Sequence, residues 1–358
     1  MNRTPILVIV GPTASGKSAL GLALARVLNG SIVNADSVQI HRGLDIGSAK
    51  ATLVEQQEVP HHLIDIREPE EDYTAGDFVR DADEAIRLIG TRQRLPIVVG
   101  GSGLYLRSLL HGLAPELPRS ATVRDALRQE LDRLGPARMH EQLAAVDPRA
   151  AERIHERDTV RVLRALEVHR ITGHPISAAQ RAHGLAETRH RALVLAITAR
   201  REDLHARIQA RSQAMVRAGL LDEVRALLDS GVSPDAQSMR AIGYRHAVEV
   251  LVGGASADGL VERLARDTRR YARRQRTFFR RQLAARWLCG PMASGATARL
   301  ARAVRESLSP GAALCDFVRL SPGWPDEDQA LAAGPWSGEG IVSDADGAHL
   351  PAGECPPE

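Results

Sequence analysis

Lysine, aromatic residues and cysteine are all scarce in this sequence, and each shortage narrows what the protein can be. Lysine occurs only as Lys17 and Lys50, although lysine and arginine together number 47 in 358 residues. Aromatic residues make up 3%, so stacking of bases on aromatic side chains cannot be the main way of binding a nucleic acid. The cysteines, Cys289, Cys315 and Cys355, lack C-x-x-C spacing, which indicates neither a metal site nor a disulfide framework and favours a reducing cytoplasm.

Long hydrophobic runs are also missing. No apolar run approaches the roughly 18 residues needed to cross a bilayer, so we expect no membrane span. The first residues, MNRTPILVIVGPTASGKS, pass from an apolar segment directly into a glycine loop, which is not the pattern of a signal peptide. With 44% hydrophobic and 25% charged residues, the composition is that of a soluble globular enzyme long enough for two domains or one with an insertion.

The net charge of +3 averages over segments of opposite sign. Residues 200–286 hold 18 arginines against 10 acidic residues, a net charge of +8, and residues 287–358 hold 4 arginines against 10 acidic residues, a net charge of −6. The basic segment could therefore meet a polyanion, whereas the acidic end could not.

Short apolar segments alternate with amphipathic helical ones along much of the chain. This pattern predicts an α/β fold of the P-loop NTPase type, with a doubly wound parallel sheet. The strand candidates are residues 5–10, SIVNADS, HHLIDI, LPIVVGGSG and residues 192–198. We accordingly expect a catalytic core at 1–117, an inserted all-helical subdomain at 118–190, a second part of the core with basic helices at 191–288 and an acidic, disordered tail at 289–358.

A glycine-rich loop follows the first strand candidate and precedes a helical segment. It matches G-x-x-x-x-G-K-[ST] and consists of Gly11, Pro12, Thr13, Ala14, Ser15, Gly16, Lys17 and Ser18. Backbone N–H groups of such a loop surround phosphate oxygens, Lys17 supplies a compact positive charge, and the Ser18 hydroxyl can ligate Mg²⁺. The loop therefore predicts a polyphosphate ligand with Mg²⁺ as cofactor.

The loop alone does not identify the reaction, because kinases, hydrolases and transferases that release diphosphate all need it. The alternatives are a small-molecule kinase of the nucleoside-monophosphate type, prenyl transfer to free adenine nucleotides, and an RNA-binding switch driven by nucleotide. The long helical insertion and the basic segment favour a macromolecular acceptor.

Seven further segments occur in an order that resembles one family. They are Asp36–Gln39, Gly43–Lys50, PHHLIDI, Tyr73–Phe78, Val99–Tyr105, RVLRALEV at 161–168 and Arg240–Arg245. Together with the glycine-rich loop, over roughly residues 5–285, they are similar to the tRNA dimethylallyltransferases, also called IPP transferases. The sequence departs from that family's usual pattern at His41, Ser48 and Ala51, none of which removes the implied chemistry.

The resemblance implies a monomeric cytoplasmic enzyme that moves a dimethylallyl group from dimethylallyl diphosphate to N6 of adenosine 37, in the anticodon stem-loop of tRNAs that read codons beginning with U. It also implies that the glycine-rich loop holds the donor's diphosphate and that no nucleotide is hydrolysed. Because an exocyclic amine is a poor nucleophile, a carboxylate must accept its proton as the new C–N bond forms.

Site residues follow from the same resemblance, position by position. Asp36 matches the general base, Ser102 a hydroxyl near the reacting centre, and Lys17 with Arg211 the cations that stabilise the leaving diphosphate. The implied contacts with tRNA are Asp36, Ser37, Val38, Gln39, Ser102, Arg124, Val160, Arg161, Val162, Leu163, Arg164, Arg240, Ala241, Ile242, Gly243, Tyr244 and Arg245. For the arginine-rich run at 269–281, a solvated helix face remains the alternative to phosphate contact.

Overall fold

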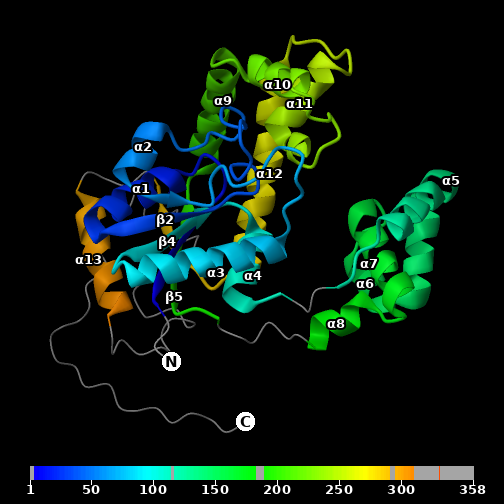
Figure 1. Ribbon diagram of the computed structural model, residues 1–358, viewed down its shortest axis with the longest axis horizontal. Coiled ribbons are helices and arrows are strands. Elements are labelled where there is room, and N and C mark those ends of the chain that lie inside the picture. The colour runs from blue at the N-terminus through cyan, green and yellow to red at the C-terminus, as the bar shows by residue number, and fades with distance from the viewer. Residues whose placement is uncertain (1–3, 114–116, 183–188, 291–294, 310–329, 331–358) are drawn as a thin grey trace, which may run out of the picture. The chain divides into compact units, whose positions relative to one another are not determined.

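A sheet of six parallel strands lies in the larger of two units, which we call the core unit (residues 1–107 and 190–358) and the helical unit (residues 108–189) (Figure 1). The computed structural model describes residues 4–113, 117–182, 189–290, 295–309 and 330. The strands are β1 (Ile6–Val10), β2 (Gly30–Ala35), β3 (His61–His62), β4 (Leu95–Gly100), β5 (Ala192–Thr198) and β6 (Arg286–Cys289), in the spatial order β3-β2-β4-β1-β5-β6.

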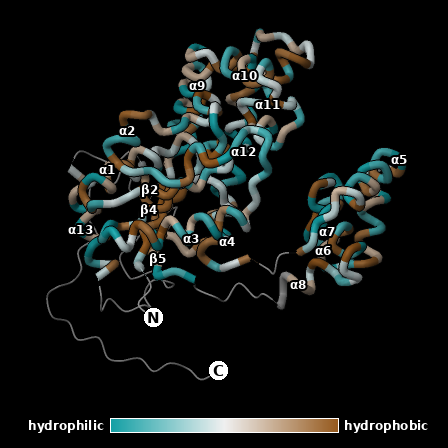
Figure 2. Tube along the Cα trace, viewed as in Figure 1, coloured by the Kyte–Doolittle hydropathy of each residue, from teal (hydrophilic) through white to brown (hydrophobic). Residues whose placement is uncertain are grey.

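The sequence pattern of the central strands follows from their burial. All five residues of β1 are buried, and β4 and β5 are buried except at their first residues, because helices cover both faces of the sheet. Figure 2 shows these strands as the hydrophobic centre of the core unit. The expected α/β fold with a doubly wound parallel sheet is therefore confirmed.

Two crossovers wind the sheet in opposite directions. Helix α1 (Lys17–Leu28) leads from β1 to β2, and α3 (Ala75–Thr91) leads from β3 to β4, which lies the other way along the sheet. Because crossovers between parallel strands are right-handed, the two helices lie on opposite faces. Leu24 of α1 lies in one apolar cluster with Leu7 and Ile9 of β1. Among the described residues, this cluster contains none of α3, although both helices contact β2 and β4.

Several further helices belong to the core unit, and most of them pack against one another. Helix α9 packs against α12, and α10 packs against α11 around a separate apolar cluster that includes Leu44 and Tyr244. These elements are α2 (Leu53–Glu58), α4 (Gly103–His111), α9 (Arg201–Arg217), α10 (Leu220–Asp229), the short 3₁₀ helix η1 (Ser238–Arg240), α11 (Ile242–Leu251) and α12 (Leu260–Gln282).

Four helices make up the helical unit, namely α5 (Ala121–Val146), α6 (Pro148–Arg153), α7 (Thr159–Thr172) and α8 (Ile176–Ala182). Its own core includes Leu127, Met139 and Leu166. The two ends of this insertion are joined, because the Arg189 N–H donates to the Leu110 carbonyl at 3.0 Å. The compact unit begins at residue 108, whereas the sequence pattern predicts a start at residue 118. No helix of the described residues is both long and apolar enough to cross a membrane.

Residues 289–290 and 295–309 differ from the expectation of a disordered tail from 289 onward. The chain forms β6, which pairs with β5, and then α13 (Ala296–Leu308). Leu300, Val304 and Leu308 recur at helical spacing and pack into the apolar cluster that contains α1, which explains why this part is ordered. The rest of the expected tail, apart from Ala330, lies outside the described residues.

Helix α13 should therefore contribute to the stability of the core unit. We expect Leu300→Ala to lower the free energy of unfolding by about 2–4 kcal/mol, because loss of the fully buried side chain leaves a cavity against the sheet. Urea unfolding followed by far-UV circular dichroism measures the change. Arg302→Ala, at an exposed position of the same helix, is the control and should change stability by less than about 0.5 kcal/mol. Equal stability of the two variants would show that α13 is not part of the folded core.

Candidate active site

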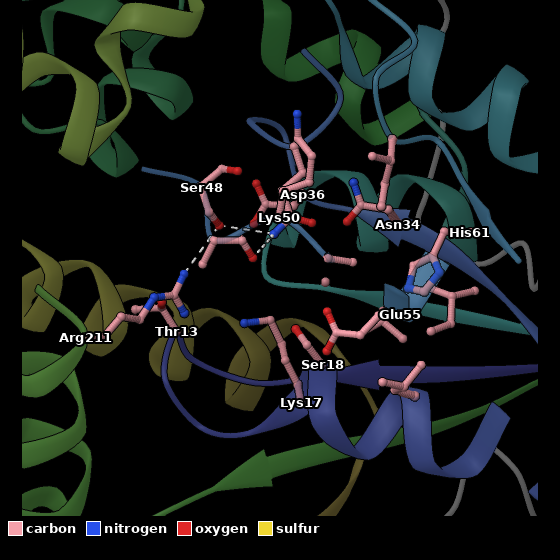
Figure 3. A pocket seen from close by; sticks show the side chains of 18 of the residues that line it. Thr13, Lys17, Ser18, Asn34, Asp36, Ser48, Lys50, Glu55, His61 and Arg211 are labelled. Atoms are coloured by element: carbon pink, nitrogen blue, oxygen red, sulfur yellow. Dashed lines mark hydrogen bonds between the residues drawn. The ribbon is translucent and has the colours of Figure 1, made fainter. Parts of the chain in front are cut away.

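The glycine-rich loop connects β1 to α1 and forms the floor of a pocket at the carboxyl ends of the strands (Figure 3). Lys17 and Ser18 extend from the first turn of α1 into this pocket, and Arg211 enters it from α9. The start of a helix presents free N–H groups and the positive end of the helix dipole, so this floor suits an anion. Other polar or charged residues that line the pocket are Thr13, Asn34, Asp36, Gln39, Ser48, Lys50, Glu55, His61, Tyr271 and Gln275.

Two cationic side chains share the pocket and influence each other. Burial, together with the neighbouring Arg211, lowers the pKa of Lys17 to about 8, although Asp36 opposes both effects. Burial also lowers the pKa of the Arg211 guanidinium, while Asp36 raises it. Two desolvated cations, of which Arg211 lowers the pKa of Lys17, favour an anion bound beside them, and a diphosphate would supply that negative charge.

The ends of β2 and β4 place Asp36 beside Ser102. Gly100 makes this possible, because a Cβ at that position would lie 2.1 Å from the Ala35 carbonyl oxygen. The Val38 N–H donates to Asp36 Oδ1 at 2.9 Å, which fixes the carboxylate at the pocket wall. Ser102 Oγ accepts from the Ser37 N–H at 3.1 Å, so the two segments are tied together.

Two residues of α12 also line the site, and neither is among the site residues that the sequence motifs indicate. Gln275 accepts from the Thr13 N–H at 2.9 Å and donates to the Gly101 carbonyl at 2.9 Å, so one side chain joins the glycine-rich loop to the end of β4. Tyr271 lines the pocket, and burial together with Asp36 raises its pKa to about 12. The sequence does contain a signal for Gln275. Ala272, Gln275 and Phe279 recur at helical spacing, which places an uncharged glutamine on the buried face of an arginine-rich helix.

The second lysine is held by the protein itself. Lys50 is 4% exposed, and its Nζ donates to the His41 carbonyl at 2.8 Å and to carboxylate oxygens of Asp45 at 2.6 Å and Asp65 at 2.5 Å. Its charge is therefore matched by neighbouring groups. Of the two lysines, only Lys17 is placed to neutralise a bound anion.

In the motif Arg240–Arg245 of the core unit, some of the residues expected to contact tRNA are exposed and others are buried. Arg240 and Arg245 are exposed at the surface of η1 and α11. Gly243 is buried and Tyr244 is 0% exposed, with its hydroxyl donating to Glu223 at 2.7 Å. Burial argues against direct side-chain contact of Tyr244 with RNA, so the motif RAIGYR contains both surface residues and structural ones.

The same division holds in the helical unit. Val160 is 80% exposed and Arg161 is exposed, whereas Val162 belongs to the unit's apolar core. Arg124 and Arg164 both donate to the buried carboxylate of Glu167, at 3.0 and 2.7 Å. Both arginines are therefore held by a buried partner. Arg161 instead pairs with Asp158 at the surface, at 3.4 Å, so Val160 and Arg161 are the more accessible candidates for contact with a ligand.

Sequence comparison agrees with this geometry. The model of the family described as IPP transferase matches residues 39–282. A tRNA dimethylallyltransferase of Pelobacter propionicus is 48% identical over 79% of this chain and 92% of its own, and one of Geobacter sulfurreducens is 45% identical over 80% and 92%.

A solved structure is similar as well. The tRNA isopentenylpyrophosphate transferase of Bacillus halodurans superposes with a TM-score of 0.64 at 34% identity, over 86% of this chain and 97% of its own. The family model spans well over half of the sequence and includes Gln39, Arg211 and Gln275 of the pocket. This chain belongs to the IPP transferase family.

Proposed function

We propose that this protein transfers a dimethylallyl group from dimethylallyl diphosphate to the N6 amine of an adenine in tRNA, at adenosine 37 of the anticodon loop. The observation that carries the proposal is the pairing of opposite charges in one pocket. Lys17 and Arg211 supply the positive charge that a diphosphate needs, and Asp36 supplies a carboxylate on the wall above them. Similarity to curated tRNA dimethylallyltransferases supports the choice of donor and acceptor.

The chemistry requires each of these groups. The N6 nitrogen forms a bond to C1 of the dimethylallyl group while the bond from C1 to the diphosphate oxygen breaks, and the proton of the amine passes to Asp36. Negative charge builds on the leaving diphosphate, where Lys17 and Arg211 stabilise it more in the transition state than in the ground state. Diphosphate and prenylated RNA are the products.

A magnesium ion fits this pocket. The Ser18 hydroxyl lines it together with the Asp36 carboxylate, and Mg²⁺ in phosphate sites is bound by one or two protein oxygens plus phosphate and water. Among the described residues, no group of three or more His, Cys, Asp or Glu side chains is arranged to hold a metal ion, and a magnesium site of this kind does not require such a group. When bound through Ser18, the ion would add positive charge beside the diphosphate.

Recognition of the RNA falls to the exposed members of the motifs. The target adenine is stacked in its loop and must be flipped into the pocket, where the segment from Asp36 to Gln39 forms a wall. Arg240, Arg245 and Arg161 are exposed cations that suit phosphate contacts.

Mass spectrometry of the RNA tests the proposal. We expect an anticodon stem-loop with adenosines at positions 36, 37 and 38 to gain one C₅H₈ unit when incubated with the protein, dimethylallyl diphosphate and Mg²⁺. An otherwise identical RNA with inosine at position 37 lacks the exocyclic amine and should keep its mass. Turnover of ATP without RNA, and no gain of mass by the adenosine RNA, would instead identify a kinase.

A further inference from the structure

A single carboxylate of α10 holds a loop that lines the pocket. Oε2 of Glu223 accepts from the backbone N–H groups of Asp45 at 3.0 Å and Ile46 at 2.7 Å. Oε1 accepts from the N–H of Gly47 at 3.2 Å and from the hydroxyl of Tyr244 at 2.7 Å. Glu223 lies 178 residues from Asp45 in sequence, so the contact is wholly tertiary.

This arrangement needs a carboxylate and not merely a polar side chain. Each oxygen of Glu223 faces two donors, and only an ionised carboxylate offers acceptors on both sides. The amide of a glutamine would turn an NH₂ group toward two other donors, which leaves those donors unpaired. The charge on Glu223 is therefore part of the structure of the loop.

The aromatic ring of Tyr244 fills the space beneath the same loop. A Cβ at position 47 would lie 2.6 Å from the ring, so only glycine allows the backbone to rest on it. Burial and the charge of Glu223 raise the pKa of Tyr244, which keeps its hydroxyl protonated as a donor. The ring of Tyr244 and the backbone at Gly47 are thus complementary in shape. This packing contact joins the two motif segments Gly43–Lys50 and Arg240–Arg245.

The loop in turn fixes two side chains of the pocket. Arg211 donates from Nη2 to the Ser48 carbonyl at 3.4 Å, and Gln39 donates from Nε2 to the carbonyls of Ser48 at 3.1 Å and Ala49 at 3.2 Å. The positions of these carbonyls depend on the preceding backbone at 45–47, which Glu223 holds. A shift of the loop would consequently move the guanidinium away from a bound diphosphate.

We propose that Glu223 and Tyr244 are a positioning pair for the transfer reaction, acting through the loop at 45–50 on Arg211 and Gln39. The inference rests on the proposed function for its effect on catalysis, but the loop itself can be tested separately. In this proposal Tyr244 supports the loop from below and does not contact RNA. The proposal also makes Glu223, which no motif singled out, a determinant of donor use.

Two alanine variants on the same helix provide the test. In Glu223→Ala we expect kcat/KM for dimethylallyl diphosphate to fall by about 10²-fold, with a lower kcat as well as a higher KM, because misplacement of Arg211 by about 1 Å is enough for such a loss. Hydrogen exchange at the amides of residues 45–47 should become fast in the same variant. Asp222→Ala, next in sequence but paired with the exposed Arg225 at the surface, should match the wild type in both measurements.

Conservative variants separate positioning from folding. Glu223→Gln should behave like Glu223→Ala, whereas Glu223→Asp should recover part of the loss because it keeps a carboxylate. Tyr244→Phe removes one hydroxyl and should raise KM by a few-fold with little change in the thermal midpoint. This variant keeps the test available if Glu223→Ala fails to fold.

Two outcomes would overturn the positioning pair. One is unchanged exchange at residues 45–47 in both Glu223→Ala and Tyr244→Phe. The other is a loss of activity in Glu223→Ala that lowers only the fraction of active protein and leaves both KM and kcat per active site at the wild-type values. If the wild-type protein itself fails to modify RNA, the proposed function fails, and the exchange measurement still decides whether Glu223 holds the loop.

Discussion

Replacing Asp36 by asparagine is expected to lower the rate of prenyl transfer by about 10²–10⁴-fold while leaving tRNA binding largely unchanged. The amide oxygen of the introduced asparagine can still accept from the Val38 N–H, so the turn after β2 should keep its conformation. What is lost is a group able to accept the proton of the attacking amine. Single-turnover assays with excess enzyme measure the transfer rate, and fluorescence anisotropy of a labelled stem-loop measures binding.

Asp36→Ala and a magnesium titration distinguish the other roles that this carboxylate could have. If Asp36 only capped the turn, the asparagine variant would be nearly as active as the wild type and only the alanine variant would be impaired. If Asp36 mainly held Mg²⁺, raising the Mg²⁺ concentration would restore the transfer rate of the asparagine variant. Either result would remove the general-base assignment, whereas equal loss in both variants at all metal concentrations supports it.

Lys17→Ala is expected to lower kcat/KM for dimethylallyl diphosphate by about 10²–10³-fold, because the pocket loses a cation that stabilises the leaving diphosphate. Binding of the stem-loop should change much less. The lowered pKa of Lys17 adds a dependence on pH. Since this pKa is about 8, the ammonium charge is lost as the pH rises through 8, and kcat/KM for the donor should then fall about tenfold per pH unit.

The pH profile also provides the control. Lys17→Arg should abolish the decline above pH 8, because guanidinium stays protonated, even if the variant is slower overall. Lys50→Arg should keep the decline, since Lys50 is buried among Asp45, Asp65 and the His41 carbonyl. A wild-type profile that is flat up to about pH 10 would contradict a loss of the Lys17 charge near pH 8 in the free enzyme.

The layout of the sheet could be predicted because its signals are local. The expected strand at residues 192–198 is β5, and the apolar runs before the glycine-rich loop and before Gly101 are β1 and β4. A strand buried on both faces must be apolar throughout, which makes it visible in the sequence alone. Strand β6 was missed because RWLC is short and follows an arginine-rich helix without a turn signal.

The interior of the site could not be predicted in the same way. Gln275 reaches Thr13 across 262 residues, and no periodicity in either segment indicates that contact. Motifs identify positions but do not distinguish a surface residue from a buried one, so Tyr244 and Val162 were both expected to touch RNA and both are buried. That distinction depends on how α11 and α7 rotate against their neighbours, which is decided by packing of the whole unit.

The joined ends of the helical unit affect which changes of sequence length the fold can accept during evolution. The insertion leaves and rejoins the chain at one point, where the Arg189 N–H meets the Leu110 carbonyl, and its helices enclose an apolar centre of their own. A segment with these properties can be lengthened, exchanged or trimmed as a cassette without altering the register of any strand.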